Sequence, residues 1–185
     1  MRTGKMLVVA VLFCVVPLAV VQAQRTPGSI SLAAYGGVGL LMGPDSFKDY
    51  WKMGIGLGAE IRYNFTEYSC VGISFTYQPF GLKEGSAELG GTLKMHILSG
   101  NFVQYFTSPD NPICLYATLG GGYYMMKPEE GNASEDESGL NGGAALEMMV
   151  SRDLFLFAEG KFHYVFTEGD HTSFITIMGG IRWAP

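Results

Sequence analysis

Positive charge is scarce in this 185-residue chain, which carries 12 lysines and arginines against 17 aspartates and glutamates. The basic residues form no patch or run, so the sequence lacks the electrostatic footprint of a nucleic-acid-binding protein. His96 and His163 do not have the spacing of metal ligands. We therefore expect no nucleic-acid partner, no metal and no cofactor.

Long apolar runs are absent after residue 23. The apolar stretch over residues 6–21 is shorter than the roughly 20 residues that span a bilayer, and Pro17 interrupts it. Arg2 and Lys5 precede this stretch, and a small-residue cleavage pattern ending at Ala23 follows it. We predict a signal peptide over residues 1–23; a retained transmembrane helix is the weaker interpretation.

The chain that follows the predicted signal peptide is too short for a second domain. Residues 24–185 show no linker and no change in composition, and a chain of about 160 residues suits one domain. Removing Arg2 and Lys5 leaves 10 basic against 17 acidic residues, a net charge of −7. We expect one acidic domain over residues 24–185.

Strict alternation of side chains dominates this domain. Between Trp51 and Phe65, every second residue is apolar and the residues between them are glycines, Glu60, Arg62 or other polar groups. Such a strand has one apolar and one polar face. Eight segments with this pattern are predicted as strands: Ser29–Leu40, Trp51–Phe65, Tyr68–Phe80, Thr92–Tyr105, Ile113–Met125, Leu140–Met149, Leu154–Tyr164 and Phe174–Trp183.

The fourth of these segments changes phase along its length. Its first half places Leu93, Met95 and Ile97 on the apolar face, opposite Lys94 and His96. The pattern then shifts near residues 99–100, where one extra residue in a β-bulge would restore the parity. We therefore predict a bulge there, with Lys94 on the polar face.

The connections between the segments alternate in length. Short turns are expected at residues 66–67, 108–111 and 151–153, and longer loops at 42–50, 81–90, 127–139 and 168–172. An open sheet would leave unpaired backbone groups in lipid, so a membrane-inserted sheet must close. The sequence predicts an all-β, eight-stranded antiparallel up-and-down transmembrane β-barrel with both termini in the periplasm.

The last segment, Thr176–Trp183, carries a family resemblance. Its alternating apolar and aromatic residues look like the C-terminal signal of the small eight-stranded outer-membrane barrels, the group of OmpX and the OmpA transmembrane domain. Ala184 and Pro185 follow the final aromatic residue, which departs from that pattern. The resemblance implies a monomer in the bacterial outer membrane, surrounded by lipid and recognised through its last strand by the barrel assembly machinery.

The polar faces are expected to fill the interior of the barrel. Ala59-Glu60-Ile61-Arg62-Tyr63 and Ala158-Glu159-Gly160-Lys161-Phe162 each place an acid and a base two residues apart. Eight strands enclose an interior only just wide enough for side chains, so we expect a salt-bridged plug that the wall glycines accommodate. The predicted interior charges are Lys52, Glu60, Arg62, Lys94, Glu147, Glu159, Lys161 and Arg182.

Aromatic residues gather at the ends of the predicted strands. An amphipathic ring prefers the headgroup level of a bilayer, so these residues are interpreted as an interfacial girdle. The core of a soluble barrel is the alternative explanation. The predicted girdle comprises Trp51, Tyr63, Phe65, Tyr77, Tyr105, Tyr123, Tyr164 and Trp183.

Two cysteines remain after the predicted cleavage. Parity places Cys70 and Cys114 on the inward face near strand starts, with one strand between them. That separation exceeds the roughly 7 Å Cα–Cα limit for a disulfide. We expect two free, buried thiols.

Two remaining features have ordinary explanations. His171 with Asp170 and Ser173 is the one candidate catalytic cluster, but adjacent residues on a short loop rarely converge on one atom. The five acidic residues of segment 127–139 lack the spacing of a calcium loop, so a mobile, solvated loop is expected. We predict that the protein is not an enzyme.

Three functions are compatible with the pattern. The first is a structural or surface-interaction role carried by extracellular loops. The second is a narrow, porin-like channel for protons or small ions through the charged interior. The third is a soluble, lipocalin-like carrier, which would turn Ile55, Leu57 and Ile61 toward an apolar ligand.

Overall fold

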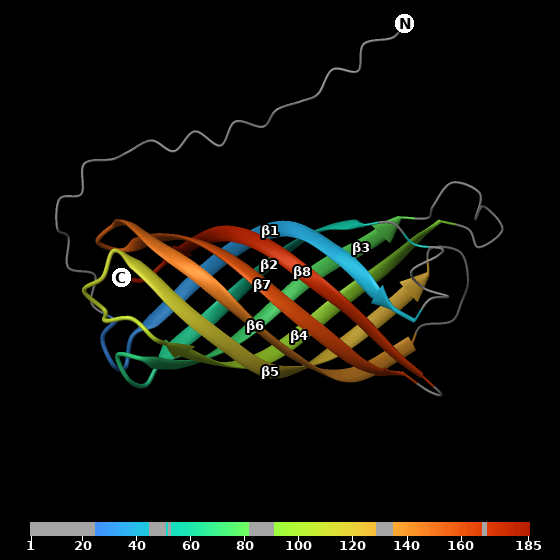
Figure 1. The fold of residues 1–185 in the computed structure, drawn as a ribbon, viewed down its shortest axis with the longest axis horizontal. Coiled ribbons are helices and arrows are strands. Elements are labelled where there is room, and N and C mark those ends of the chain that lie inside the picture. The colour runs from blue at the N-terminus through green and yellow to red at the C-terminus, as the bar shows by residue number, and fades with distance from the viewer. Residues whose placement is uncertain (1–24, 45–50, 52, 82–90, 129–134, 168–169) are drawn as a thin grey trace, which may run out of the picture.

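The computed structural model describes residues 25–44, 51, 53–81, 91–128, 135–167 and 170–185. These residues form a closed, antiparallel barrel of eight strands, which confirms the predicted fold class (Figure 1). The strands are β1 (Ile30–Gly43), β2 (Gly54–Asn64), β3 (Ser69–Gly81), β4 (Thr92–Tyr105), β5 (Ile113–Pro128), β6 (Glu135–Ser151), β7 (Leu154–Thr167) and β8 (Asp170–Trp183).

Each strand pairs with its neighbours in sequence, and β8 closes the barrel against β1. This is the up-and-down order that the alternating connections predict. Closure gives each of the eight described strands a partner on both sides, so none of them is an edge strand.

The two ends of the barrel differ in their connections. At one end, called the turn end, the connections are residues 65–68, 106–112 and 152–153. Both ends of the described chain also lie there, because Ala184 N donates to Asp153 O (2.8 Å) and Gly28 N to Asn64 O (2.6 Å). The opposite end, called the loop end, carries the connections that follow β1, β3, β5 and β7.

Some strands extend beyond their predicted limits at the loop end. β5 continues to Pro128 and β6 begins at Glu135, so residues 135–139 belong to a strand and not to the expected loop. Seven of the eight strands have 13 to 17 residues, more than the roughly 9–11 residues that cross a bilayer. The barrel wall therefore projects past the length needed for a membrane span.

Apolar side chains cover the outer wall. Ile55, Leu57 and Leu119 are 72%, 65% and 69% exposed, respectively, while their sequence neighbours Gly54, Gly56 and Thr118 face inward and are buried. Ile61 also points outward, so these side chains cannot line an internal cavity as the lipocalin-like hypothesis requires. In the described part of the chain, no helix has the length and apolar character to span a membrane.

β4 corrects the predicted phase. Its odd-numbered residues are buried from Leu93 to Tyr105, and its pairing with β3 and β5 runs without a shift. The expected bulge at residues 99–100 was therefore wrong; the irregular registers lie between Leu41 and Gly43 and between Met149 and Ser151. Continuous parity turns Leu93, Met95 and Ile97 into the barrel and Lys94 and His96 outward.

Inward glycines make room for long side chains, as predicted. A Cβ atom on Gly58 would overlap the ring of Tyr35, which lies directly opposite on β1. A Cβ atom on Gly56 would overlap the amide of Gln78, which is fully buried. The glycine row of β2 therefore sets how far these side chains extend across the interior.

Candidate functional site: the filled interior

Six charged side chains meet inside the barrel on its turn-end side. They form the charge network, whose members are Glu60, Arg62, Glu147, Glu159, Lys161 and Arg182. All six except Glu159 are buried, and Glu159 is largely so. Three acids balance three bases, which is the condition under which buried charge is tolerated.

Same-strand pairs begin this network. On β2, Arg62 Nε lies 2.8 Å from Glu60 Oε2, and on β7, Lys161 Nζ lies 2.8 Å from Glu159 Oε1. The acid-base spacing repeated in the sequence thus gives an ion pair on each strand. Because residues two apart share one face of a strand, both pairs point into the interior.

Arginines connect these pairs across the interior. Arg182 on β8 binds Glu147 Oε2 at 2.7 Å and Glu60 Oε2 at 3.1 Å. Arg62 lies 3.7 Å from Glu159 Oε2, which links β2 with β7. The planar guanidinium groups suit this role because each can serve two carboxylates.

Two buried tyrosines extend the network. The hydroxyl of Tyr105 accepts from Arg62 Nη1 (3.2 Å) and donates to Glu147 (3.5 Å). The hydroxyl of Tyr116 accepts from Arg62 Nη2 (3.2 Å) and donates to Glu159 (3.3 Å). Sequence reasoning missed both roles, although their inward parity on β4 and β5 was readable.

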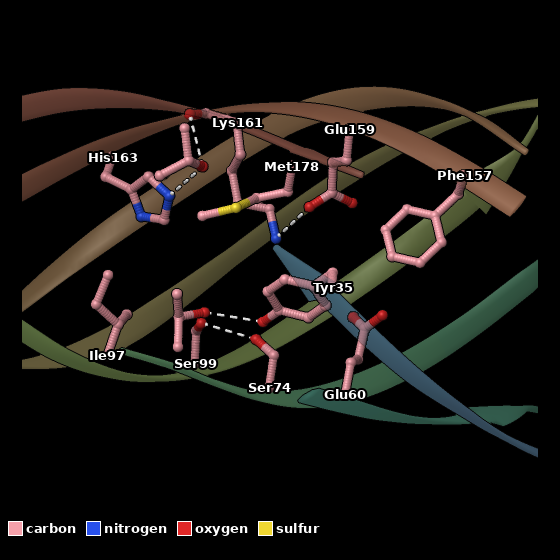
Figure 2. Close-up of a pocket in the computed structure, with 12 residues that line it drawn as sticks. Tyr35, Glu60, Ser74, Ile97, Ser99, Phe157, Glu159, Lys161, His163 and Met178 are labelled. Carbon is pink, nitrogen blue, oxygen red and sulfur yellow. Dashed lines mark hydrogen bonds and ion pairs between the residues drawn. The ribbon is translucent and has the colours of Figure 1, made fainter. Parts of the chain in front are cut away.

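A layer of hydroxyl-bearing side chains follows toward the middle of the barrel, beside Glu60, Glu159 and Lys161 of the charge network (Figure 2). There Tyr35 contacts Thr76 (2.8 Å) and Ser74 contacts Ser99 (3.1 Å), while the Lys161 ammonium extends to Glu159. These residues line a cavity of about 20 Å³, enough for a water molecule and too small for a hydrated solute.

An apolar cluster fills the loop-end side of the interior. Its members are Phe80, Leu93, Met95, Ile97, Tyr124, Met126, Val165 and Phe174. His163 adjoins it, stacked on Phe174 at 4.4 Å between ring centroids and in contact with Tyr124 (3.0 Å) and Thr176 (3.2 Å). This cluster was not predicted, because alternation placed Leu93, Met95 and Ile97 on the lipid-facing side of the strand.

The predicted interior charges therefore divide into three groups. Six of them form the charge network. Lys94 lies on the outward face of β4, directly opposite Lys127 of β5, so its assignment to the interior was wrong. Lys52 falls outside the described residues.

The predicted girdle residues also separate. Tyr63, Phe65, Tyr77, Tyr123, Tyr164 and Trp183 lie on the outward face. Tyr105 does not, since its ring is buried in the interior at the turn end. Trp51 packs against the apolar cluster at the loop end. Parity along each strand, more than position at a strand end, decides which aromatics face outward.

The Arg25 side chain enters the barrel interior through the turn end. This position was not predicted from the sequence. The Arg25 guanidinium lies 3.8 Å from the centre of the Tyr105 ring, and its Nη2 donates to Cys114 Sγ at 2.8 Å. Cys70 and Cys114 are both free and buried, which confirms the prediction. Nothing in the local sequence pattern indicates that a residue before the first strand would turn inward.

The acidic segment and His171, the remaining candidates from the sequence, belong to strands of the barrel or pack against them. Glu135, Asp136 and Glu137 belong to β6 and pair with residues 124–126, so they are not part of the expected mobile loop; Glu129 and Glu130 lie outside the described residues. His171 stacks on Tyr164 at 4.9 Å. Within the described ranges, no group of three or more metal-ligating side chains converges.

Comparison with known proteins places the architecture. No family model matches the chain, and no curated protein matches its sequence. The N-terminal β-barrel domain of Pseudomonas aeruginosa OprF superposes with a TM-score of 0.65 at 13% identity, covering 87% of this chain and 100% of that one. The fold is that of the small outer-membrane β-barrels.

Two further outer-membrane barrels have this fold. Neisserial surface protein A gives a TM-score of 0.61 at 10% identity, covering 83% of this chain and 96% of that one. Ail of Yersinia pestis, solved with a heparin analogue, gives 0.56 at 22% identity, covering 86% and 100%. The TM-scores establish the shared barrel fold. Identities this low say nothing of function, which has to be argued from the interior of the barrel.

Proposed function

We propose that this protein is a monomeric outer-membrane barrel that acts through its loop-end surface and not by passing solutes through its interior. The observation that carries the proposal is the double filling of that interior. A neutral charge network occupies the turn-end side and an apolar cluster the loop-end side. A solute would have to displace both.

The location and orientation belong to the same proposal. The apolar outer wall requires hydrocarbon around it, and the fold is shared with proteins of the outer membrane. The turn end, where both ends of the described chain lie, is assigned to the periplasm, and the loop end to the exterior. β8, which closes the barrel against β1, is the strand that the barrel assembly machinery would recognise.

A narrow proton path is the second candidate function. Its support is the hydroxyl and imidazole chain in which His163 joins Tyr124 and Thr176, with Lys161 nearby. The apolar cluster interrupts this chain toward the loop end, because its buried aliphatic side chains offer no hydrogen bonds. The interruption favours the surface role.

Recordings in a planar lipid bilayer test the proposal. We expect no stepwise openings from the purified protein, with heat-modifiable gel mobility proving that the barrel is folded. Stable openings of one defined size would overturn the surface role. Vesicles loaded with a pH-sensitive dye separate the second candidate, since proton entry without ion conductance would favour it.

A further inference from the structure

We propose that the Arg25 side chain is a releasable cap, which the fixed turn at residues 26–29 directs into the turn-end mouth of the barrel and which shields Cys114. The cap is distinct from the charge network and from the apolar cluster. It concerns access to the interior from one end and does not depend on what the loops bind.

The local sequence explains why the chain turns back under the barrel. Thr26-Pro27-Gly28-Ser29 forms a turn in which Ser29 N donates to Thr26 O at 3.1 Å. Proline second and a glycine with φ of +88° third are the requirements of a type II turn. The turn reverses the chain just before β1 and directs Arg25 toward the mouth.

Backbone contacts fix this turn to the end of β2. Gly28 N donates to Asn64 O (2.6 Å), and Asn64 N donates to Ser29 O (2.9 Å). The Asn64 side chain adds a bond from Nδ2 to Ser29 Oγ at 2.9 Å. These contacts hold the turn in place whether or not the Arg25 side chain is inserted.

The inserted side chain makes contacts of a weaker kind. Arg25 is 7% exposed and stacks on Tyr105, with Nη2 donating to the thiol of Cys114 and, at 3.5 Å, to Ser108 O. Sulfur is a weak acceptor, and Nη1 has no hydrogen-bond partner among the described residues.

This weakness makes the cap releasable. The interior ion pairs found within the described chain involve Arg62, Lys161 and Arg182, but not Arg25. A buried cation without a carboxylate keeps part of its desolvation cost. Withdrawing Arg25 into water is therefore easier than opening the charge network, and local opening should begin at this end.

Cys114 reports the state of the cap. Its thiol is buried, donates to Asn111 O (3.3 Å) and is covered by the Arg25 guanidinium. A small, charged maleimide added to the folded protein in detergent reaches it only when the cap opens. A Cys70→Ser background leaves Cys114 as the single thiol of the described residues.

We expect Arg25→Ala to accelerate labelling of Cys114 about tenfold, since the stacking contact is lost. Gly28→Ala should accelerate it as well, because alanine is strained at this positive φ although nothing obstructs its Cβ atom. Arg152→Ala, at an exposed arginine of the turn 152–153, is the matched control and should leave the rate unchanged.

Three outcomes would overturn the cap. Wild-type Cys114 could label as fast as in the unfolded chain, or Arg25→Ala and Gly28→Ala could both leave the rate unchanged. Equal acceleration of Cys70, measured in a Cys114→Ser background, would indicate general loosening, because Cys70 has no described contact with Arg25. Gel mobility confirms folding in each variant, and planar-bilayer conductance, which tests the surface role, is read separately.

Discussion

The two halves of the barrel interior are filled by opposite kinds of chemistry. On the turn-end side, six charged residues and two tyrosines contact one another through ion pairs and hydrogen bonds of 2.7 to 3.7 Å. On the loop-end side, eight buried residues, most of them purely apolar, pack around aromatic contacts such as Phe80–Phe174 at 6.0 Å. Both halves exclude solutes, but removing one side chain has different consequences in each.

The difference follows from what a lost side chain leaves behind. In the charge network, removing one partner strands an opposite charge in a low-dielectric interior. In the apolar cluster, removing one side chain leaves a cavity whose cost depends on how well its neighbours collapse. We therefore expect the charged half to tolerate single substitutions less well than the apolar half.

Arg182→Met should have the largest effect. It removes the partner that lies 2.7 Å from Glu147 and leaves that carboxylate, among the described residues, with only the Tyr105 hydroxyl. We expect a loss of about 3–5 kcal/mol in the free energy of unfolding, measured by denaturant titration in lipid vesicles. Adding Glu147→Gln should restore part of it; an additive double variant would contradict the coupling.

Met95→Ala probes the apolar half. Met95 is 0% exposed, so its truncation should cost roughly 2–5 kcal/mol in the same assay through cavity formation. The adjacent Lys94→Ala is the matched control and should cost less than Met95→Ala, because Lys94 faces outward and its truncation leaves no internal cavity. A larger loss for Lys94→Ala than for Met95→Ala would indicate that Lys94 faces inward and Met95 outward, as predicted from the sequence.

Leu57→Arg tests the outer wall that encloses both halves. Leu57 lies near the middle of the outward row of β2, where a charge in hydrocarbon should cost about 2–4 kcal/mol. Leu57→Met, which keeps the side chain apolar, should change stability by less than about 0.5 kcal/mol. Equal effects of the two variants on unfolding from vesicles would place Leu57 outside the hydrocarbon.

The two halves were also unequally predictable from the sequence. Where polar residues face inward and apolar residues face lipid, as at Glu60 and Ile61, alternation fixes both the strand and its facing. All eight strands and the ion pairs of β2 and β7 follow from that rule. The rule holds only at hydrocarbon depth, where the outer wall must be apolar.

At the loop end of β4 this rule is reversed, because apolar residues face inward and polar residues face outward. Alternation alone cannot show which face is the inner one. Lys94 and His96 face outward while Leu93, Met95 and Ile97 face inward, because this part of β4 is sealed on the inside by apolar packing. Parity counted back from the inward, polar Ser99 and Asn101 without a bulge would have given the correct facing. Arg25 was beyond any such rule, since its position depends on a turn docking against Asn64.

Tyr105→Phe should have the smallest effect and separates the charge network from the cap. Tyr105 offers its hydroxyl to Arg62 and Glu147 and its ring face to Arg25. Losing the hydroxyl should cost about 1–3 kcal/mol of unfolding free energy, because it leaves buried charged partners less satisfied. The phenylalanine ring still stacks with Arg25, so labelling of Cys114 should remain slow, whereas Tyr105→Leu should accelerate it.

Tyr116→Phe removes an equivalent hydroxyl from Arg62 without any described contact with Arg25, so it controls for the loss of stability alone. Fast labelling in Tyr105→Phe together with slow labelling in Tyr116→Phe would mean that the hydroxyl, and not the ring, holds the cap.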